Sequence, residues 1–132
     1  MRDVARFRAE RAKRREFERL VARTLERLPD PIYEMLDNVE VVVEDEPTAD
    51  QIGAASDPAE TLFGLYQGIP LTQRDSGYSM VLPDKITIFR GPLERAFPTP
   101  AAIAEQVQIT VIHELAHHLG IDEARLDELG WA

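Results

Sequence analysis

The feature that most constrains this chain is a long apolar helix, predicted over residues 99 to 119, that carries two histidines near its end. Thr99-Pro100 predicts its start, because threonine caps free backbone amides and proline at the first helical position loses no hydrogen bond. Gly120 predicts its end, because glycine readily adopts the left-handed conformation that terminates helices. Apolar residues recur along it at helical spacing: Ile103, Val107, Val111, Leu115 and Leu119. We therefore expect this helix to be mostly buried.

Within this helix, residues 113 to 117 have the spacing His-Glu-x-x-His. His113 and His117 are four residues apart, so on a helix they share one face with Cβ atoms about 5 to 6 Å apart. Two imidazoles at that separation can bind one tetrahedral Zn²⁺ and leave room for a third protein ligand and a water. Glu114 can then reach the metal-bound water, as in zinc hydrolases. The alternative, two hydrogen-bonded core histidines beside a surface glutamate, is disfavoured because burying imidazoles without partners costs free energy.

A third metal ligand is expected just after the helix. Counting from His113, the spacing His-Glu-x-x-His-x-x-Gly-x-x-Glu puts Glu123 three residues past Gly120. A turn at this glycine could swing the Glu123 carboxylate back to the metal, so Glu123 is the favoured ligand. Asp122, which is shorter and one residue nearer, is the alternative.

Three further polar residues are candidates for supporting roles. His118 lies about 100° from His117 around the helix, so we expect it to be structural or to support the site without binding metal. Tyr66 or Tyr78 could donate a hydrogen bond to a developing oxyanion. No sequence feature brings either tyrosine to the metal, so a core or loop position is the first expectation for both.

Composition restricts the class of protein. The length of 132 residues predicts a single domain over residues 1–132. The absence of cysteine excludes disulfides and thiolate metal sites, so a bound metal must be held by His, Asp or Glu. No apolar run approaches the roughly 18 residues of a membrane span, and the first residues lack a secretory signal. We therefore expect a cytoplasmic protein with no membrane partner.

The net charge of −9 hides an asymmetry. Residues 1–28 hold ten Lys and Arg against five Asp and Glu, whereas residues 29–132 hold five against nineteen. Residues 1–14 are expected to form a basic helical arm that frays or projects from an acidic body. Nucleic acid is not expected as a partner, because the chain as a whole would repel a polyanion.

The remaining pattern indicates an α+β protein. Its predicted elements are a helix over 3–28 that stops at Pro29-Asp30-Pro31, a short turn of helix over 32–36, strands over 39–44, 62–66 and 85–90, a loop over 47–60, a polar connection over 71–84, and a last helix over 122–129. The first and third strands are rich in β-branched residues without strict polar alternation. We expect helices to cover them.

Three segments of the chain resemble the small bacterial zincin-like metallopeptidase family: Leu62 to Thr72, Ile86 to Leu93 and His113 to Glu123. The last is similar to the Asp-zincin motif His-Glu-x-x-His-x-x-Gly-x-x-Asp, with glutamate in the final position. The resemblance implies a minimal zincin-like fold, in which a small mixed sheet packs against an N-terminal helix and the active-site helix. It also implies that the strand Ile86-Thr87-Ile88-Phe89 is an edge that pairs with an extended peptide substrate.

The function predicted from these features is that of a zinc-dependent peptidase. One Zn²⁺ per chain would bind His113, His117 and Glu123, and Glu114 would be the general base for the metal-bound water that hydrolyses a peptide bond. The alternative is a zinc-stabilised module that binds a peptide or protein without cleaving it. A weaker third hypothesis is that the basic arm recruits an acidic partner. Metzincins add a methionine-containing turn beneath the metal, and none of the nine residues after Glu123 is methionine.

Overall fold

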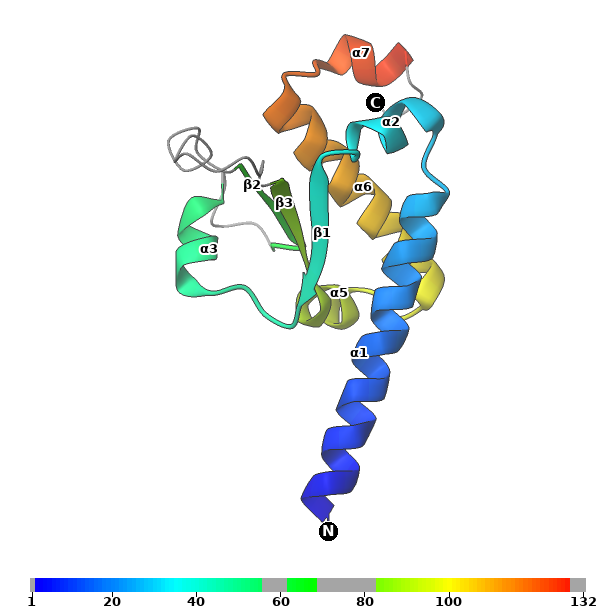
Figure 1. Cartoon of the computed structure of the whole chain (residues 1–132), viewed down its shortest axis with the longest axis vertical. Coiled ribbons are helices and arrows are strands. Elements are labelled where there is room, and N and C mark those ends of the chain that lie inside the picture. The colour runs from blue at the N-terminus through cyan, green and yellow to red at the C-terminus, as the bar shows by residue number, and fades with distance from the viewer. Residues whose placement is uncertain (1, 56–61, 69–82, 129–132) are drawn as a thin grey trace.

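The computed structural model describes residues 2–55, 62–68 and 83–128, with only the backbone for residues 2–7 and 123 (Figure 1). Its elements are α1 (Arg2–Glu26), α2 (Asp30–Met35), β1 (Val39–Glu44), α3 (Ala49–Ala54), β2 (Gly64–Gln67), β3 (Asp84–Phe89), α5 (Arg90–Ala96), α6 (Pro100–Leu119) and α7 (Glu123–Glu128). Helices surround one small sheet, as expected for an α+β protein.

The sheet has three strands in the order β1-β3-β2, with β1 parallel and β2 antiparallel to β3. The prediction that residues 86–89 form an edge is therefore wrong, because β3 is hydrogen-bonded on both sides. Ile86, Ile88 and Phe89 have no exposed surface. A strand this apolar is more stable in the centre, where neighbouring elements cover both of its faces. The two edge strands of the sheet are β1 and β2, and β2 is the edge strand that borders the cavity beside α6.

Helix α6 begins and ends as the sequence predicts. The hydroxyl oxygen of Thr99 accepts a hydrogen bond from the amide of Ala102 at 3.2 Å. Gly120 has φ 70° and ψ 27°, and its N–H donates to the carbonyl of Ala116. Four residues of the predicted stripe are buried, Ile103, Val107, Val111 and Leu115, and so are Ile112 and Ala116 outside it. Leu119 is 49% exposed, so the buried stripe ends one turn before the helix does.

Helix α1 packs its C-terminal half against the rest of the chain. Phe17, Val21 and Leu28 are buried in the same core as α6, and the buried Thr24 donates its hydroxyl to the carbonyl of Leu20 at 2.7 Å. The N-terminal turns of α1 extend past the body of the molecule (Figure 1). No helix in the described ranges is both long enough and apolar enough to cross a membrane.

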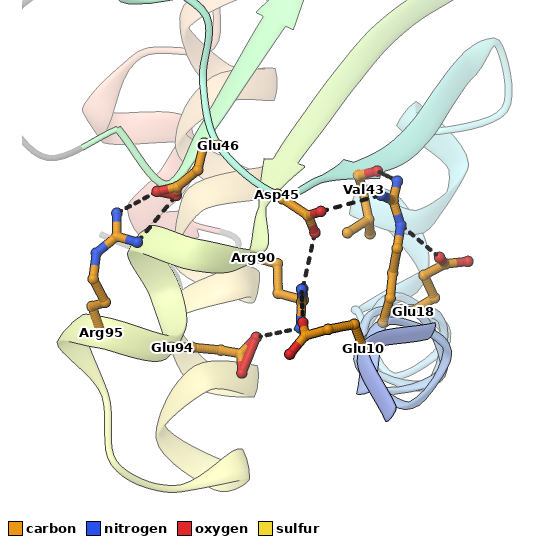
Figure 2. A network of polar contacts seen from close by, with 9 residues as sticks. Glu10, Glu18, Val43, Asp45, Glu46, Arg90, Glu94 and Arg95 are labelled. Carbon is orange, nitrogen blue, oxygen red and sulfur yellow. Dashed lines mark hydrogen bonds and ion pairs between the residues drawn. The ribbon is translucent and has the colours of Figure 1, made fainter. Parts of the chain in front are cut away.

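A cluster of ion pairs joins α1 to the sheet and to α5 (Figure 2). Arg90 pairs with three carboxylates, those of Asp45, Glu94 and Glu10, at 3.0, 3.1 and 3.4 Å. Arg14 donates to the carbonyl of Val43 at 2.6 Å and pairs with Asp45 at 3.5 Å. The Arg90 side chain is only 12% exposed, whereas its three carboxylate partners are 44 to 55% exposed, so each pair alone contributes little and the contacts act as a network.

The prediction of a loop over residues 47–60 is wrong where α3 forms. Thr48 and Gln51 make a capping box: the Thr48 hydroxyl accepts from the Gln51 amide at 3.1 Å, and the Gln51 side-chain oxygen accepts from the Thr48 amide at 2.8 Å. The predicted connection over 71–84 falls almost wholly outside the described residues. Helix α5 follows β3 without a loop, and the predicted end of the strand at Gly91-Pro92 lies in the first turn of this helix.

Gly64 marks the closest approach of β2 to α6. A Cβ there would lie 2.7 Å from Cγ2 of Thr110 and 3.1 Å from the carbonyl oxygen of Thr87. We predict that Gly64→Ala lowers the free energy of unfolding by about 1 to 3 kcal/mol. Gly53 is the matched control, because a Cβ on that helical residue meets no described atom within 4 Å. Gly53→Ala should be neutral or stabilising by up to about 1 kcal/mol in the same urea titration. Equal destabilisation by both would contradict the close packing.

Candidate active site

A cavity of about 280 Å³ lies between β2 and the C-terminal half of α6. The residues from α6 that line it include His113, Glu114, His117 and His118, and those from β2 and the residue before it are Phe63, Gly64, Leu65 and Tyr66. Ala54 at the end of α3 closes part of the wall. The whole His-Glu-x-x-His pattern thus opens into one cavity beside the edge of the sheet.

The two histidines of the pattern are exposed, whereas Glu114 is half-buried. The neighbouring apolar residues Ile112 and Leu115 point into the core. Sequence reasoning expected the imidazoles to be buried along with the rest of the helix, and this is wrong. The apolar residues occupy the opposite side of α6, which turns His113 and His117 toward solvent in the cavity. The alternative of two core histidines is therefore excluded.

Glu114 has the environment of a carboxylate that can exchange a proton. Burial raises its pKa above the ordinary value, while a hydrogen bond from the backbone N–H of Tyr66 and the proximity of His117 act in the opposite direction. A carboxylate whose pKa is shifted toward neutrality is a better proton acceptor near physiological pH. The Tyr66 amide also orients the carboxylate, because it ties Glu114 to the edge strand.

Tyr66 lies at the site, but its hydroxyl is already engaged. This hydroxyl donates to Oδ2 of Asp84 at 2.5 Å, and its ring stacks on His118 with centroids 4.4 Å apart. In this position the phenol proton is directed to Asp84 and not to an oxyanion. Tyr78 lies outside the described residues. Sequence reasoning missed Asp84, which stands at the start of β3 and carries no local signal of a contact with Tyr66.

His118 lies between Tyr66 and the residues of the His-Glu-x-x-His pattern. Its ring meets that of His117 edge-on, with centroids 5.2 Å apart, and its Nε2 lies 3.9 Å from a carboxylate oxygen of Glu114. Burial and the neighbouring His117 lower the pKa of His118, and Asp84 partly offsets this. Its stack on Tyr66 holds the imidazole against the wall of the cavity. A supporting role for His118 stays a prediction.

After Gly120 the chain reverses direction and begins α7. The side chain of Asp122 accepts a hydrogen bond from the Arg125 amide at 2.9 Å, and its carbonyl accepts one from Leu126 at 3.0 Å. Asp122 is thus the N-cap of α7. Glu123 is the first residue of that helix, and its side chain lies outside the described part of the structure. Among the described side chains, no three of His, Asp or Glu form a group that could hold a metal. The third ligand stays a prediction.

The donors at the cavity fit zinc in their chemistry. Imidazole nitrogen and carboxylate oxygen are both ordinary zinc ligands, and a chain without cysteine has no thiolate to compete with them. His113 and His117 open into the same cavity one helical turn apart. They therefore fit two corners of a tetrahedral site.

Residues 36–131 match the model of the zincin-like metallopeptidase family. This chain belongs to that family. The match covers well over half of the chain and includes all three strands, α6 and the His-Glu-x-x-His pattern. Membership confirms the predicted family and the α+β zincin-like fold, and it implies a metal, typically zinc, and a peptide substrate. No curated protein is significantly similar to this chain, and α1 lies outside the matched region.

The contact between Tyr66 and Asp84 can be tested by stability. Tyr66→Phe removes the hydroxyl and leaves the ring that stacks on His118, so we predict a loss of about 0.5 to 1.5 kcal/mol in the free energy of unfolding. Tyr33 is the matched control, because its side chain is 49% exposed. Tyr33→Phe should change stability by less than about 0.5 kcal/mol. Thermal unfolding of both variants measures the difference, and an unchanged Tyr66→Phe protein would contradict the contact.

Proposed function

We propose that this chain is a zinc-dependent peptidase with Glu114 as its general base. The observation that carries the proposal is that His113, Glu114 and His117 open into one cavity beside the edge strand β2. Membership in a metallopeptidase family supports it. The neighbouring residues Ile112 and Leu115 are buried in the core, so apart from Ile109 the helix presents polar residues to the cavity.

One zinc ion per chain is held by His113, His117 and Glu123. When bound, it supplies a Lewis acid that polarises the scissile carbonyl and lowers the pKa of water. Asp122 caps α7 through its carboxylate, which supports Glu123 as the third ligand. Because Glu123 directly follows the cap, the start of α7 fixes its backbone just beyond the turn at Gly120.

Glu114 moves the proton in the reaction. A carboxylate oxygen of Glu114 accepts a proton from the attacking water and then delivers it to the nitrogen of the leaving amine. The hydrogen bond from the Tyr66 amide holds the carboxylate in place for both transfers. Burial raises the pKa of Glu114, which favours proton uptake at neutral pH.

The substrate is an extended peptide that adds to the outer edge of β2. Within the described residues, β2 is paired only with β3 and borders the cavity along Gly64, Leu65 and Tyr66. An edge strand offers a row of backbone donors and acceptors to a peptide. We therefore assign to β2 the pairing with an extended peptide that the sequence led us to expect of residues 86–89.

A second candidate function is a zinc-stabilised module that binds peptides on β2 without cleaving them. It is favoured by the Tyr66 hydroxyl, which donates to Asp84 in this structure and so does not provide an oxyanion donor. In such a module, loss of zinc would loosen the domain, and no peptide would be cleaved at any pH.

The proposed mechanism makes Glu114→Gln the decisive variant. It should retain about one zinc per chain but lose cleavage of a peptide library by about 10²-fold or more, because the amide cannot accept the proton. Glu105→Gln, at an exposed position on the same helix, is the matched control and should retain both properties. Undiminished cleavage by a zinc-loaded Glu114→Gln protein would sink the mechanism. A zinc-loaded wild-type protein that cleaves nothing would instead favour the binding module.

The ligand assignment predicts a contrast between two adjacent carboxylates. His113→Ala, His117→Ala and Glu123→Ala should each weaken zinc binding by about 10-fold or more in a competition titration, because each removes a ligand. Asp122→Asn should bind zinc normally, and it also preserves the cap of α7 because asparagine is as good an N-cap as aspartate. Normal binding by Glu123→Ala together with weak binding by Asp122→Asn would reverse the assignment.

A further inference from the structure

A second hollow, separate from the active-site cavity, is lined by residues of α1, α2, β1 and the turn between α2 and β1. Its volume is about 660 Å³, and its floor is apolar: Ala22, Leu25, Leu36, Val39 and Val41. An adjoining hollow of about 420 Å³ shares Ala22, Leu25 and Val41 and continues along α1 and β1. We call the two together the α1–β1 groove. It shares no lining residue with the active-site cavity.

The wider end of the α1–β1 groove has an acidic rim. Glu26, Glu34 and Asp37 line it, and all three are exposed. No Lys or Arg lines this end, and among the described residues none of the three carboxylates makes an ion pair. An apolar floor with a negative rim is complementary to a segment that combines apolar and basic residues.

The chain itself contains such a segment at its start. Residues 2–13 hold five Lys and Arg against two Asp and Glu, and their only large apolar residues are Val4 and Phe7. This arm is helical from Arg2 onward and extends past the body of the molecule (Figure 1). A helical segment of this length is marginal in water unless it packs on something.

The start of the arm cannot reach the apolar floor of the groove in its own molecule. Both belong to α1, which runs as one helix from Arg2 to Glu26. At 1.5 Å per residue, residue 8 lies about 21 Å along the axis from Ala22 in the groove floor. A straight helix cannot fold its start onto its own end. The groove can therefore receive an arm only from another molecule.

We propose that two copies of this chain pair by exchanging arms, so that residues 2–13 of each copy lie in the α1–β1 groove of the other. The two α1 helices then run antiparallel, and both contacts are equivalent by two-fold symmetry, which closes the assembly as a dimer. By composition, the arm has two large apolar residues, Val4 and Phe7, to match the apolar floor and a net positive charge to match the acidic rim. These contacts act against the repulsion between two acidic bodies.

The first test is the mass of the full-length protein in sedimentation equilibrium. We expect a dimer at low ionic strength whose dissociation constant rises with added salt, because salt screens the arm from the rim. A protein that stays monomeric at millimolar concentration would overturn the proposal and would leave the groove to a basic peptide of another protein. A dimer that is insensitive to salt would also overturn it.

Charge reversal identifies the two surfaces. A groove variant with Glu34→Lys and Asp37→Lys should be monomeric, and so should an arm variant with Arg6→Glu and Arg8→Glu. An equimolar mixture of the two should recover the dimer, because each arm then meets a groove of opposite charge. A dimer that persists in either variant alone, or a mixture that stays monomeric, would overturn the exchange.

The matched control is Asp50→Lys with Glu105→Lys, which changes the net charge by the same amount at exposed positions on α3 and α6, outside the groove. It should remain a dimer. Loss of the dimer in this control would attribute the effect to overall charge and overturn the assignment of the rim. Far-UV circular dichroism of every variant verifies that the helices are intact.

Discussion

The orientation of α6 about its own axis determines which of its residues enter the core and which face the cavity. Val107, Val111 and Leu115 bury one side of the helix against β3 and α1, with no more than 1% of each side chain exposed. Successive residues are about 100° apart, so this burial turns His113 and His117 outward into the cavity. A rotation by one residue would bury an imidazole and expose a core side chain. The free energy of core packing thus holds the His-Glu-x-x-His pattern in position.

The sequence predicted the elements whose signals are local. The cap at Thr99, the glycine at position 120 and the β-branched run of β1 each act through neighbouring residues, and each lies where it was expected. The order of the strands could not be predicted, because it depends on pairings between segments more than 40 residues apart, such as β1 with β3. Helix α3 had a readable signal in the capping box of Thr48 and Gln51, but six residues are too few to show an apolar periodicity.

The site likewise contains some contacts that the sequence predicts and others that it does not. The spacing within α6 predicts that the histidine pair and Glu114 lie together, because a helix fixes the positions of residues three and four apart. The tie from Tyr66 to Asp84 joins two strands and depends on their antiparallel register, which no local pattern encodes. The exposure of the histidines was misjudged for a related reason. A helix that is apolar on most of its surface still exposes one side, and only the packed structure shows which side that is.

The ion pairs of Arg90 show that the boundary of the family match is not a boundary of the packed structure. This residue lies inside the matched region, yet it contacts Glu10 on α1, which lies outside it. Phe17, Val21 and Leu28, all before residue 36, belong to the same core as α6. A shortened protein that begins at residue 36 would retain the whole His-Glu-x-x-His pattern but expose an apolar face of the helix that carries it. For this chain, recombinant expression of the matched region alone would give a poor measure of the properties of the site.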